Sequence, residues 1–337
     1  MQHLFPEAAK NTFVDLFCGV GGIRLGMETA GFECVMSSDI DPECRNTYYR
    51  NFHEMPLGDI TKIEAASIPD HDILCAGFPC QPFSISGKKK GFDDTRGTLF
   101  FEICRILDKK HPRVVFLENV KNLIYHDHGL TFSVILNTLA DLGYFVQWRV
   151  LNASDFGIPQ NRERVIIIAS KEKRFDFDEI EKQPRTRLED LLDTDGDLAF
   201  LRLDEYTLIE KPRLQPSGLI FVGYRNKPLR KAGVRPGTEY LSRTHRQPDR
   251  IYSVCGIHPT LSSQETSGRY FILTQDGRVR KLTLDECWRL MGFPESFIKI
   301  SSISEQYRQL GNSVCVPMVT AIAKEIKRQF FLQADSK

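Results

Sequence analysis

The stretch Phe13-Val14-Asp15-Leu16-Phe17-Cys18-Gly19-Val20-Gly21-Gly22 decides the fold. Its first five residues form a short apolar strand, and the glycines after them predict a turn into a helix that contains residues 23–27. Because glycine lets the backbone approach a ligand closely, this order of strand, turn and helix indicates a nucleotide-type loop. The dinucleotide fingerprint requires a glycine where Arg24 stands, so the stretch disfavours a nicotinamide enzyme.

A second apolar strand, residues 34–38, ends at Asp39, twenty positions after Gly19. A carboxylate at that distance can accept hydrogen bonds from both hydroxyls of an adenosine ribose. The alternative is a helix N-cap ahead of Pro42, which Asp41 would serve equally well.

A third strand is expected to end at residues 58–60. There Asp59 could accept the exocyclic amine of an adenine, and Ile60 could cover the face of the ring. A Gly-Asp pair is more often only a turn, so this assignment depends on its neighbours.

Further strands are predicted at 73–76, 113–117, 145–151 and 165–169, with a helix at 130–142. The near-continuous apolar character of 113–117 is typical of a sheet that is covered on both faces. Strands and helices alternate up to residue 170, which favours an α/β fold with a doubly wound sheet.

The stretch Phe78-Pro79-Cys80-Gln81-Pro82-Phe83-Ser84 follows the strand at 73–76. Neither proline can donate to a strand ladder, so Cys80 is expected where the chain leaves the sheet, at the edge where α/β folds bind ligands. The alternative is a small buried hydrophobic residue, the usual fate of a free cysteine. Four other cysteines lie in or beside apolar elements and are interpreted as packing residues: Cys18, Cys75, Cys104 and Cys315.

The 337 residues carry a net charge of +1, so any nucleic-acid binding must arise from local clusters. The nine cysteines include no Cys-x-x-Cys pair, which supports neither a disulfide framework nor a zinc site, and we expect no metal. With neither a secretory signal nor an apolar run long enough to span a bilayer, the expected location is a reducing cytoplasm.

Charge changes sign after the predicted sheet. Residues 171–210 are rich in acids, whereas 211–250 are basic and contain Tyr224, Tyr240 and several glycines. Basic side chains mixed with aromatics suit a surface that tracks phosphates and reads bases, although a solvated face is the plainer interpretation. Regular structure returns with a capping box at Thr283 and Glu286, and a final helix carries Pro317 in its first turn.

Taken together, the motifs resemble those of the DNA cytosine carbon-5 methyltransferase family, in its bacterial restriction-modification form. The resemblance covers nearly the whole chain and is weakest at 171–270. It rests on 15–22, 77–84, Glu118-Asn119-Val120, Gln160-Asn161-Arg162-Glu163-Arg164, 289–294 and 310–314. Met291 stands where the family often has glutamine.

The resemblance implies a Rossmann-like sheet that binds S-adenosylmethionine and a smaller, mostly irregular or β domain that recognises DNA. We expect a catalytic domain at 1–170, a target-recognition domain at 171–300, and a C-terminal segment at 301–337 that returns to the first domain. By position, the residues implied to line the cofactor are Phe17, Gly19, Val20, Gly22, Asp39, Ile40, Asp59, Ile60, Pro79, Leu99, Asn312 and Val314.

The same resemblance implies that Cys80 adds to carbon 6 of a flipped-out cytosine and that Glu118 stabilises charge at ring nitrogen 3. The alternative for Glu118 is a salt bridge at a strand end. Arg162 and Arg164 alternate with Glu163 and so should point the same way, one toward the cytosine carbonyl oxygen and the other toward the loop or a phosphate. The residues expected to contact DNA are Ser84, Ser86, Lys88, Lys89, Arg96, Arg225, Arg230, Arg235, Arg243, Arg246 and Thr260.

Duplex DNA is the expected partner, the protein is expected to be a monomer, and a restriction nuclease is expected to share its target. One alternative is a methyltransferase of transfer RNA, a branch that lacks a long basic recognition stretch. Another is a DNA-binding protein without catalysis, which should have lost Cys80 or Glu118; both are present.

Overall fold

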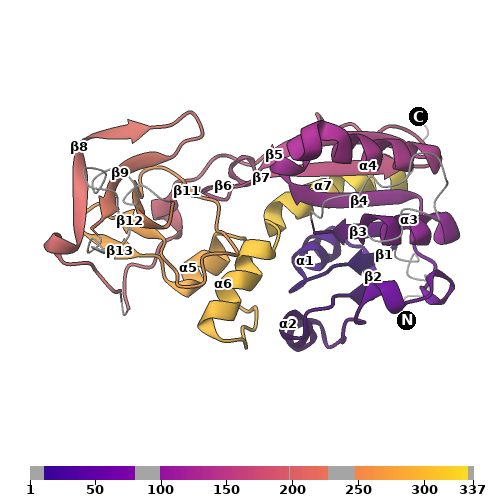
Figure 1. Ribbon diagram of the computed structural model, residues 1–337, viewed down its shortest axis with the longest axis horizontal. Helices are drawn as coiled ribbons and strands as arrows, with labels where there is room; N and C mark the ends of the chain where they lie inside the picture. The colour runs from indigo at the N-terminus through magenta and orange to yellow at the C-terminus, as the bar shows by residue number, and fades with distance from the viewer. Residues whose placement is uncertain (1–10, 80–98, 197, 227–246, 333–337) are drawn as a thin grey trace, which may run out of the picture. The chain divides into compact units, whose positions relative to one another are not determined.

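The computed structural model describes residues 11–79, 99–196, 198–226 and 247–332 (Figure 1). The chain divides into two compact units. The first, the sheet unit, comprises Met1–Leu151, Glu163–Glu181 and Met318–Lys337. The second comprises Asn152–Arg162 and Lys182–Pro317, and we call it the recognition unit after the role that the sequence resemblance leads us to expect.

These boundaries differ from those expected at 170/171 and 300/301. Residues 152–162 leave the sheet unit because β6 (Gln160–Asn161) pairs with β11 (His258–Pro259). Residues 171–181 stay with the sheet unit, where Phe175 stacks on Phe330 at 6.2 Å between ring centroids. Helix α6 (Ile303–Asn312) belongs to the recognition unit, so the return to the sheet unit begins only at Met318.

The sheet unit is built on a six-stranded sheet of order β2-β1-β3-β4-β7-β5. The first four strands in that order are parallel, and β7 runs antiparallel to β4. The strands are β1 (Thr12–Leu16), β2 (Glu33–Ser38), β3 (Ile73–Gly77), β4 (Val114–Val120), β5 (Phe145–Asn152) and β7 (Glu163–Ser170). The strands predicted at 34–38, 73–76, 113–117, 145–151 and 165–169 are therefore present, and the α/β sheet is confirmed.

Alternation along the strands buries both faces of this sheet. Val14, Leu74 and Leu117 face a core that α3 (Leu99–Lys110) and α4 (Leu130–Asp141) close with Ile103, Leu107 and Ile135, among others. Elsewhere in the unit, α1 (Gly22–Thr29) packs closely on α7 (Val316–Ile326), since a Cβ at Gly26 would lie 2.5 Å from Val319 Cγ1. The remaining helix is α2 (Pro42–Phe52).

The prediction of a third strand that ends at residues 58–60 is wrong. Only Leu57 pairs, as an isolated bridge to Ser38, because Pro56 before it has no N–H to donate. Asp59 then caps a 3₁₀ turn, η1 (Ile60–Lys62), by accepting the Thr61 backbone N–H at 3.1 Å. The Gly58-Asp59 pair therefore forms a turn, as such pairs commonly do, and not the end of a strand.

The recognition unit contains a five-stranded sheet of order β13-β12-β10-β9-β8. Its strands are β8 (Tyr206–Leu214), β9 (Ile220–Arg225), β10 (Arg250–Ser253), β12 (Phe271–Leu273) and β13 (Val279–Lys281). The predicted capping box opens α5 (Leu284–Arg289), where Thr283 and Glu286 satisfy each other's backbone N–H groups. Among the described helices, none is both long and apolar enough to cross a membrane.

Candidate active site

The parallel strands β2, β1, β3 and β4 end at one edge of the sheet, which we call the carboxyl edge. Leu16 pairs with both Ser38 and Ala76, and Gly77 pairs with Glu118, so the residues after these positions emerge together. Strand β1 lies between β2 and β3: the strand that follows β1 in sequence is added on one side of it, and the next strand, β3, on its other side. This reversal of direction makes the carboxyl edge at β1 and β3 a topological switch point. Ligands of open α/β sheets bind at such points.

The glycine loop between β1 and α1 is strained and open. Phe17 has φ +56°, a rare conformation for a bulky side chain, and such strain gathers at functional sites. Gly19 has φ +54°, and a Cβ built on it would meet no atom of the described residues within 4 Å. Val20 and Gly22 are buried behind the loop. The space next to Gly19 can therefore accept a ligand against bare backbone.

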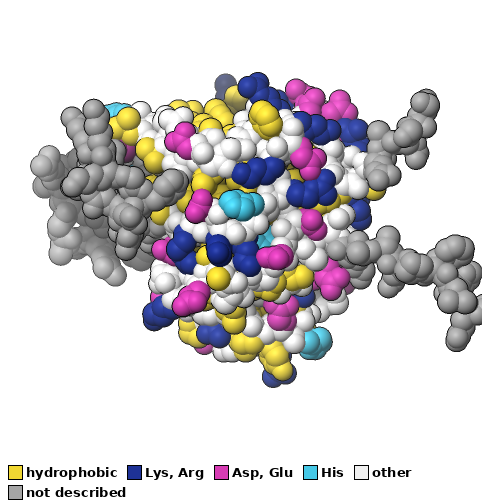
Figure 2. Space-filling view, turned by 90° about the vertical axis from the view of Figure 1, so that its right-hand side faces the viewer, with side chains coloured by type: hydrophobic (Ala, Val, Ile, Leu, Met, Phe, Trp, Pro, Cys, Tyr) yellow, Lys and Arg dark blue, Asp and Glu magenta, His cyan; other side chains and the backbone are white. Residues whose placement is uncertain are grey.

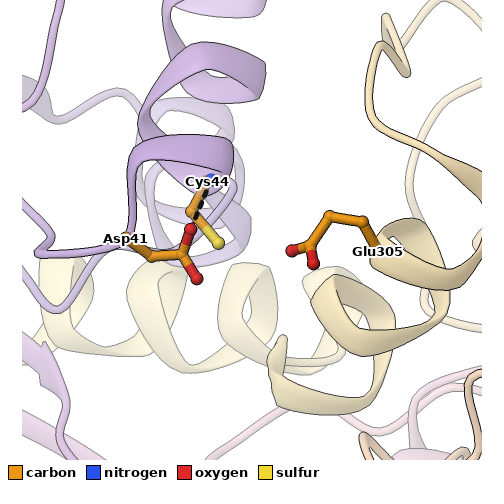
Figure 3. Close-up of side chains that lie close together, drawn as sticks. All are labelled: Asp41, Cys44 and Glu305. Atoms are coloured by element: carbon orange, nitrogen blue, oxygen red, sulfur yellow. Dashed lines mark hydrogen bonds between the residues drawn. The ribbon is translucent and has the colours of Figure 1, made fainter.

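Asp39 is fixed to this loop. Its carboxylate accepts the Gly19 N–H at 2.8 Å and the Asp41 N–H at 2.8 Å, while the Ser38 carbonyl accepts the Cys18 N–H at 3.0 Å. The N-cap of α2 is Asp41, which accepts the N–H groups of Glu43 and Cys44 (Figure 3). Asp41 is therefore the helix cap, and Asp39 is a separate acid at the end of β2. Ile40 between them is 72% exposed and available to a ligand.

The other residues expected at the cofactor are divided between the two units. In the sheet unit, Ile60 is buried, and Arg105 holds its turn by donating to the Ile60 and Ile63 carbonyls at 3.2 and 2.9 Å. Leu99 starts α3 and Pro79 is exposed after β3. Asn312 and Val314 belong to the recognition unit.

Cys80 lies outside the described residues, but its approach is well defined. The buried side chain of Asn119 donates from Nδ2 to the Phe78 carbonyl at 2.7 Å and accepts the Val120 N–H at 2.8 Å. Asn119 follows Glu118 on β4, while Phe78 follows Gly77 on β3. The strand ends that carry Glu118 and lead to Cys80 are therefore tied by a side chain that the sequence did not single out.

Glu118 and Arg164 form a nearly buried ion pair. Arg164 Nε lies 2.9 Å from Glu118 Oε1, and each side chain is only 10% exposed. Because Val120 pairs with Arg164 and Glu118 with Ile166, the two side chains are diagonal neighbours on antiparallel strands. Glu118 Oε2 is directed toward Gly77, where a Cβ would lie 3.6 Å away. Glu118 therefore forms the salt bridge that was the alternative to a catalytic role, and its second carboxylate oxygen is directed toward Gly77.

Arg162 does not share this pair. Its guanidinium is fully buried in the recognition unit and donates to the carbonyls of Leu261 at 3.1 Å, Gly311 at 2.9 Å and Ser313. Gln160 supports the same loops by donating to the Leu290 carbonyl at 2.7 Å and accepting the Leu261 N–H at 3.1 Å. We expected one of the two arginines to reach the cytosine carbonyl oxygen and the other to hold a loop or a phosphate. The described partners of Arg162 are backbone carbonyls of loops in its own unit, and the role of each arginine toward the base stays a prediction.

Most residues expected to contact DNA cannot be placed. Thr260 donates its hydroxyl to the Asn161 carbonyl at 2.6 Å, which ties it to the segment of Arg162. Arg225 ends β9 with its guanidinium carbon 5.4 Å from the centroid of the Phe271 ring. The expected contacts that lie outside the described residues are Ser84, Ser86, Lys88, Lys89, Arg96, Arg230, Arg235, Arg243 and Arg246.

Comparison with known proteins gives one family. Residues 11–328 match C-5 cytosine-specific DNA methylases. The Type II methyltransferase M.HhaI of Haemophilus parahaemolyticus is 42% identical over 325 residues, which cover 93% of this chain and 93% of that protein. The Type II methyltransferase M.NlaX of Neisseria lactamica is 43% identical over 334 residues, which cover 96% of this chain and 98% of that protein.

Solved structures agree on the fold. The S. pombe Dnmt2 methyltransferase superposes with a TM-score of 0.68 at 21% identity, covering 96% of this chain and 100% of that one. A putative DNA modification methyltransferase encoded within prophage Cp of E. coli gives 0.67 at 23% identity, covering 95% and 99%.

Proposed function

The chain belongs to the C-5 cytosine-specific DNA methylases, and we propose that its reaction takes place at the carboxyl edge with Cys80, Glu118 and Arg164 as the groups that act on the base. Members of this family transfer a methyl group from S-adenosylmethionine to carbon 5 of cytosine in DNA. The observation that carries the assignment is the buried Glu118–Arg164 pair beside the strand end that leads to Cys80.

The carboxyl edge fits the cofactor. Gly19 leaves open space beside bare backbone, Asp39 presents a fixed carboxylate, and Ile40 is exposed next to it. The bound cofactor supplies an electrophilic methyl group. In this proposal the residues that would hold it in the sheet unit are Phe17, Gly19, Val20, Gly22, Asp39, Ile40, Asp59, Ile60, Pro79 and Leu99, and those in the recognition unit are Asn312 and Val314.

Cys80 is proposed as the nucleophile. Carbon 5 of cytosine is a poor nucleophile, and a thiolate that adds to carbon 6 converts the ring to an enamine whose carbon 5 is reactive. Three other cysteines of the sheet unit suit this role less well, because they are buried and burial raises the pKa of each thiol: Cys18, Cys75 and Cys104.

Glu118 is proposed to share a proton with ring nitrogen 3 as negative charge develops there. Arg164 holds the carboxylate in place through Nε and donates from Nη1 to the Glu163 carbonyl at 2.8 Å. Its Nη2 can be presented to the cytosine carbonyl oxygen. Arg162 is instead proposed as a positioning residue, because its donors already serve carbonyls around Thr260 and Asn312. This division between the two arginines follows from their different partners.

DNA is the substrate, and its recognition is proposed to lie in the recognition unit. On the face shown in Figure 2, basic and acidic side chains are interleaved among the described residues, so this face carries no patch of a single charge sign. We assign base reading to Arg225 and to arginines at 230, 235, 243 and 246, and phosphate contact to Lys88, Lys89 and Arg96. A target base inside a duplex must be flipped out before Cys80 can reach it.

Three further properties are proposed on the family relation alone: a monomeric enzyme, a cytoplasmic location, and a restriction nuclease that recognises the same sequence. Light scattering on the purified protein tests the first. Methylation of matched DNA and transfer-RNA substrates tests the RNA alternative, which predicts that the RNA is preferred.

Cys80→Ser tests the mechanism. Duplex DNA with 5-fluorocytosine at the target should trap the parent protein as a denaturation-stable adduct, because fluorine on carbon 5 blocks the final elimination. Cys80→Ser should give no adduct and almost no methylation while still binding DNA, and Cys255→Ser, which removes an exposed thiol, is the matched control. Methylation by Cys80→Ser within about tenfold of the parent rate would refute covalent catalysis. Bisulfite sequencing of DNA from expressing cells identifies the target.

A further inference from the structure

The structure assigns Arg24 and Glu54 a positioning role in cofactor binding: with Tyr48 and Phe52 they form a clamp that holds the glycine loop and the end of β2 in register. This inference rests on the proposed cofactor site at the carboxyl edge. It concerns residues that the sequence motifs left without a function.

Arg24 is the centre of the clamp. It is nearly buried on α1, and its NH1 donates to Glu54 at 2.8 Å and to the Tyr48 hydroxyl at 3.0 Å. The guanidinium carbon lies 4.6 Å from the Phe52 ring centroid and 5.4 Å from that of Tyr48. A charge held by a carboxylate and stacked on two rings has a fixed orientation, which a lysine could not reproduce.

The aromatic half of the clamp touches the glycine loop. A Cβ at Gly21 would lie 2.2 Å from Phe52 Cε2 and 3.2 Å from Tyr48 Cδ2, so the two rings form a wall against the loop backbone. Gly21 itself has φ +91°, a conformation that side chains rarely adopt. A shift of the Phe52 ring would therefore displace the backbone of the loop that starts at Phe17.

The acidic half of the clamp reaches β2. Glu54 accepts the Ser37 hydroxyl at 3.0 Å through Oε1, while Oε2 faces Arg24. Ser37 is followed by Ser38, whose carbonyl accepts from Cys18, and by Asp39, whose carboxylate accepts from Gly19. One carboxylate thus connects α1 to the strand end that carries the proposed ribose acceptor.

Glu28 offers a matched comparison. It accepts from Arg24 Nε at 2.7 Å, but both residues lie on α1, so this contact ties the helix only to itself. The side chains of Glu28 and Glu54 are 37% and 36% exposed, so removing either charge perturbs the arginine from an equally solvated position. Glu28 and Glu54 are the described carboxylates that form ion pairs with Arg24, while burial raises the pKa of Asp15 on β1 and Arg24 opposes that shift.

The test compares Glu54→Gln with Glu28→Gln by calorimetric titration with S-adenosylmethionine. Glu54→Gln should raise the Kd for the cofactor about tenfold, the effect of weakening one charge-assisted hydrogen bond, and Glu28→Gln should stay within about twofold. At saturating cofactor, kcat of Glu54→Gln should return to within about twofold of the parent, and the Kd for DNA should be unchanged. Ser37→Ala should weaken cofactor binding in the same direction, and Arg24→Lys should not restore it.

Equal cofactor affinity in Glu54→Gln and Glu28→Gln would overturn the clamp, as would a loss of DNA affinity in Glu54→Gln that matches its loss of cofactor affinity. If Glu54→Gln does not fold, the result for Ser37→Ala decides: parental cofactor affinity in that variant refutes the connection to β2. Asp39→Ala in the same titration tests the proposed site itself, since unchanged affinity there would show that the cofactor binds elsewhere, whatever the clamp variants do.

Discussion

Glu118 and Arg164 meet at 2.9 Å across two antiparallel strands, with nine-tenths of each side chain removed from solvent. A carboxylate so placed has low solvation and a fixed cation, and it can respond to charge that develops on a base without first reorganising. We therefore propose that the pair is more than a strand-end salt bridge and that Glu118 acts as an acid–base group at the carboxyl edge.

Glu118→Gln keeps the shape of the side chain and removes its ability to share a proton. We expect kcat to fall by about 10²–10⁴, the usual contribution of a general acid or base, with the Kd for DNA changed little. Single-turnover methylation measures the step. Glu163→Gln, which breaks the partly exposed ion pair between Glu163 at the start of β7 and Lys121 just after β4, is the control and should retain parental activity. A rate for Glu118→Gln near that of the control would leave Glu118 with a structural role only.

Arg162 and Arg164 should respond differently to substitution. Arg164→Met should reduce kcat because it removes the cation that fixes Glu118. It should also destabilise the sheet unit, because the Glu118 carboxylate, 10% exposed, is left without that cation. Arg162→Met should destabilise the recognition unit by about 1–3 kcal/mol for each buried carbonyl that it strands. Chemical denaturation and kinetics of the two variants separate these roles. Equal losses of kcat at parental stability would restore Arg162 to the catalytic set.

The sheet could be predicted because its strands are apolar runs that end at glycine, proline or acidic residues. The same pattern wrongly predicted a strand that ends at 58–60. The structure has one isolated bridge there, between Leu57 and Ser38, and Pro56 before it has no N–H to donate. The bounds of the two compact units differ from the expected domain boundaries for a related reason. A two-residue pairing of β6 with β11 moves a whole segment into the recognition unit, and two residues carry no periodicity.

The sequence indicated candidate site residues where a motif and a strand end coincide, as at Asp39 and Glu118, and their roles stay predictions. It did not indicate residues whose contacts join distant parts of the chain. Asn119 reaches Phe78 across 41 positions and Arg24 reaches Glu54 across 30, and no local pattern encodes such distances. One signal was available: Tyr48 and Phe52 are four apart on a helix, so they share the face that meets Gly21.

His258 predicts how stability depends on pH. Burial lowers its pKa to about 4, and a hydrogen bond to the Pro259 carbonyl only partly opposes this shift. The unfolded chain, with an ordinary pKa near 6.5, binds the proton first as the pH falls, so the stability that neutral His258 contributes is complete above about pH 6.5 and is lost progressively down to about pH 4. Between pH 7 and pH 5 the loss should be about 2 kcal/mol.

Urea denaturation at the two pH values measures this loss. His258→Asn should reduce the difference between them, whereas His53→Asn, at an exposed position, should leave the parental difference in place. The same pH difference in His258→Asn and in the parent would mean that another group carries the dependence.

Arg225 is the expected base-reading residue that the structure describes. Its position over the Phe271 ring restricts the guanidinium and so favours a directional contact over a diffuse one with phosphate. Arg225→Ala should cost about 1–3 kcal/mol at one position of the target and relax the preference there. Arg213→Ala on β8 is the control. Selection from a randomised-site library reads the preference, and an unchanged profile for Arg225→Ala would place base reading elsewhere.

Asn119 should control how Cys80 is presented. Its side chain fixes the Phe78 carbonyl at 2.7 Å, and the intervening Pro79 has a restricted φ, so the direction in which the chain enters Cys80 depends on this bond. Asn119→Asp keeps the acceptor for the Val120 N–H but places a carboxylate against the Phe78 carbonyl. A misplacement of about 1 Å at a reacting atom can cost about 10²-fold in rate, so adduct formation with 5-fluorocytosine DNA should slow by about that factor.

The cofactor affinity of Asn119→Asp should be unchanged, because Asn119 contacts neither the glycine loop nor Asp39 among its described bonds. Asn122→Asp, at an exposed position, is the control. Adduct formation by Asn119→Asp at the parental rate would show that Cys80 is held by other contacts.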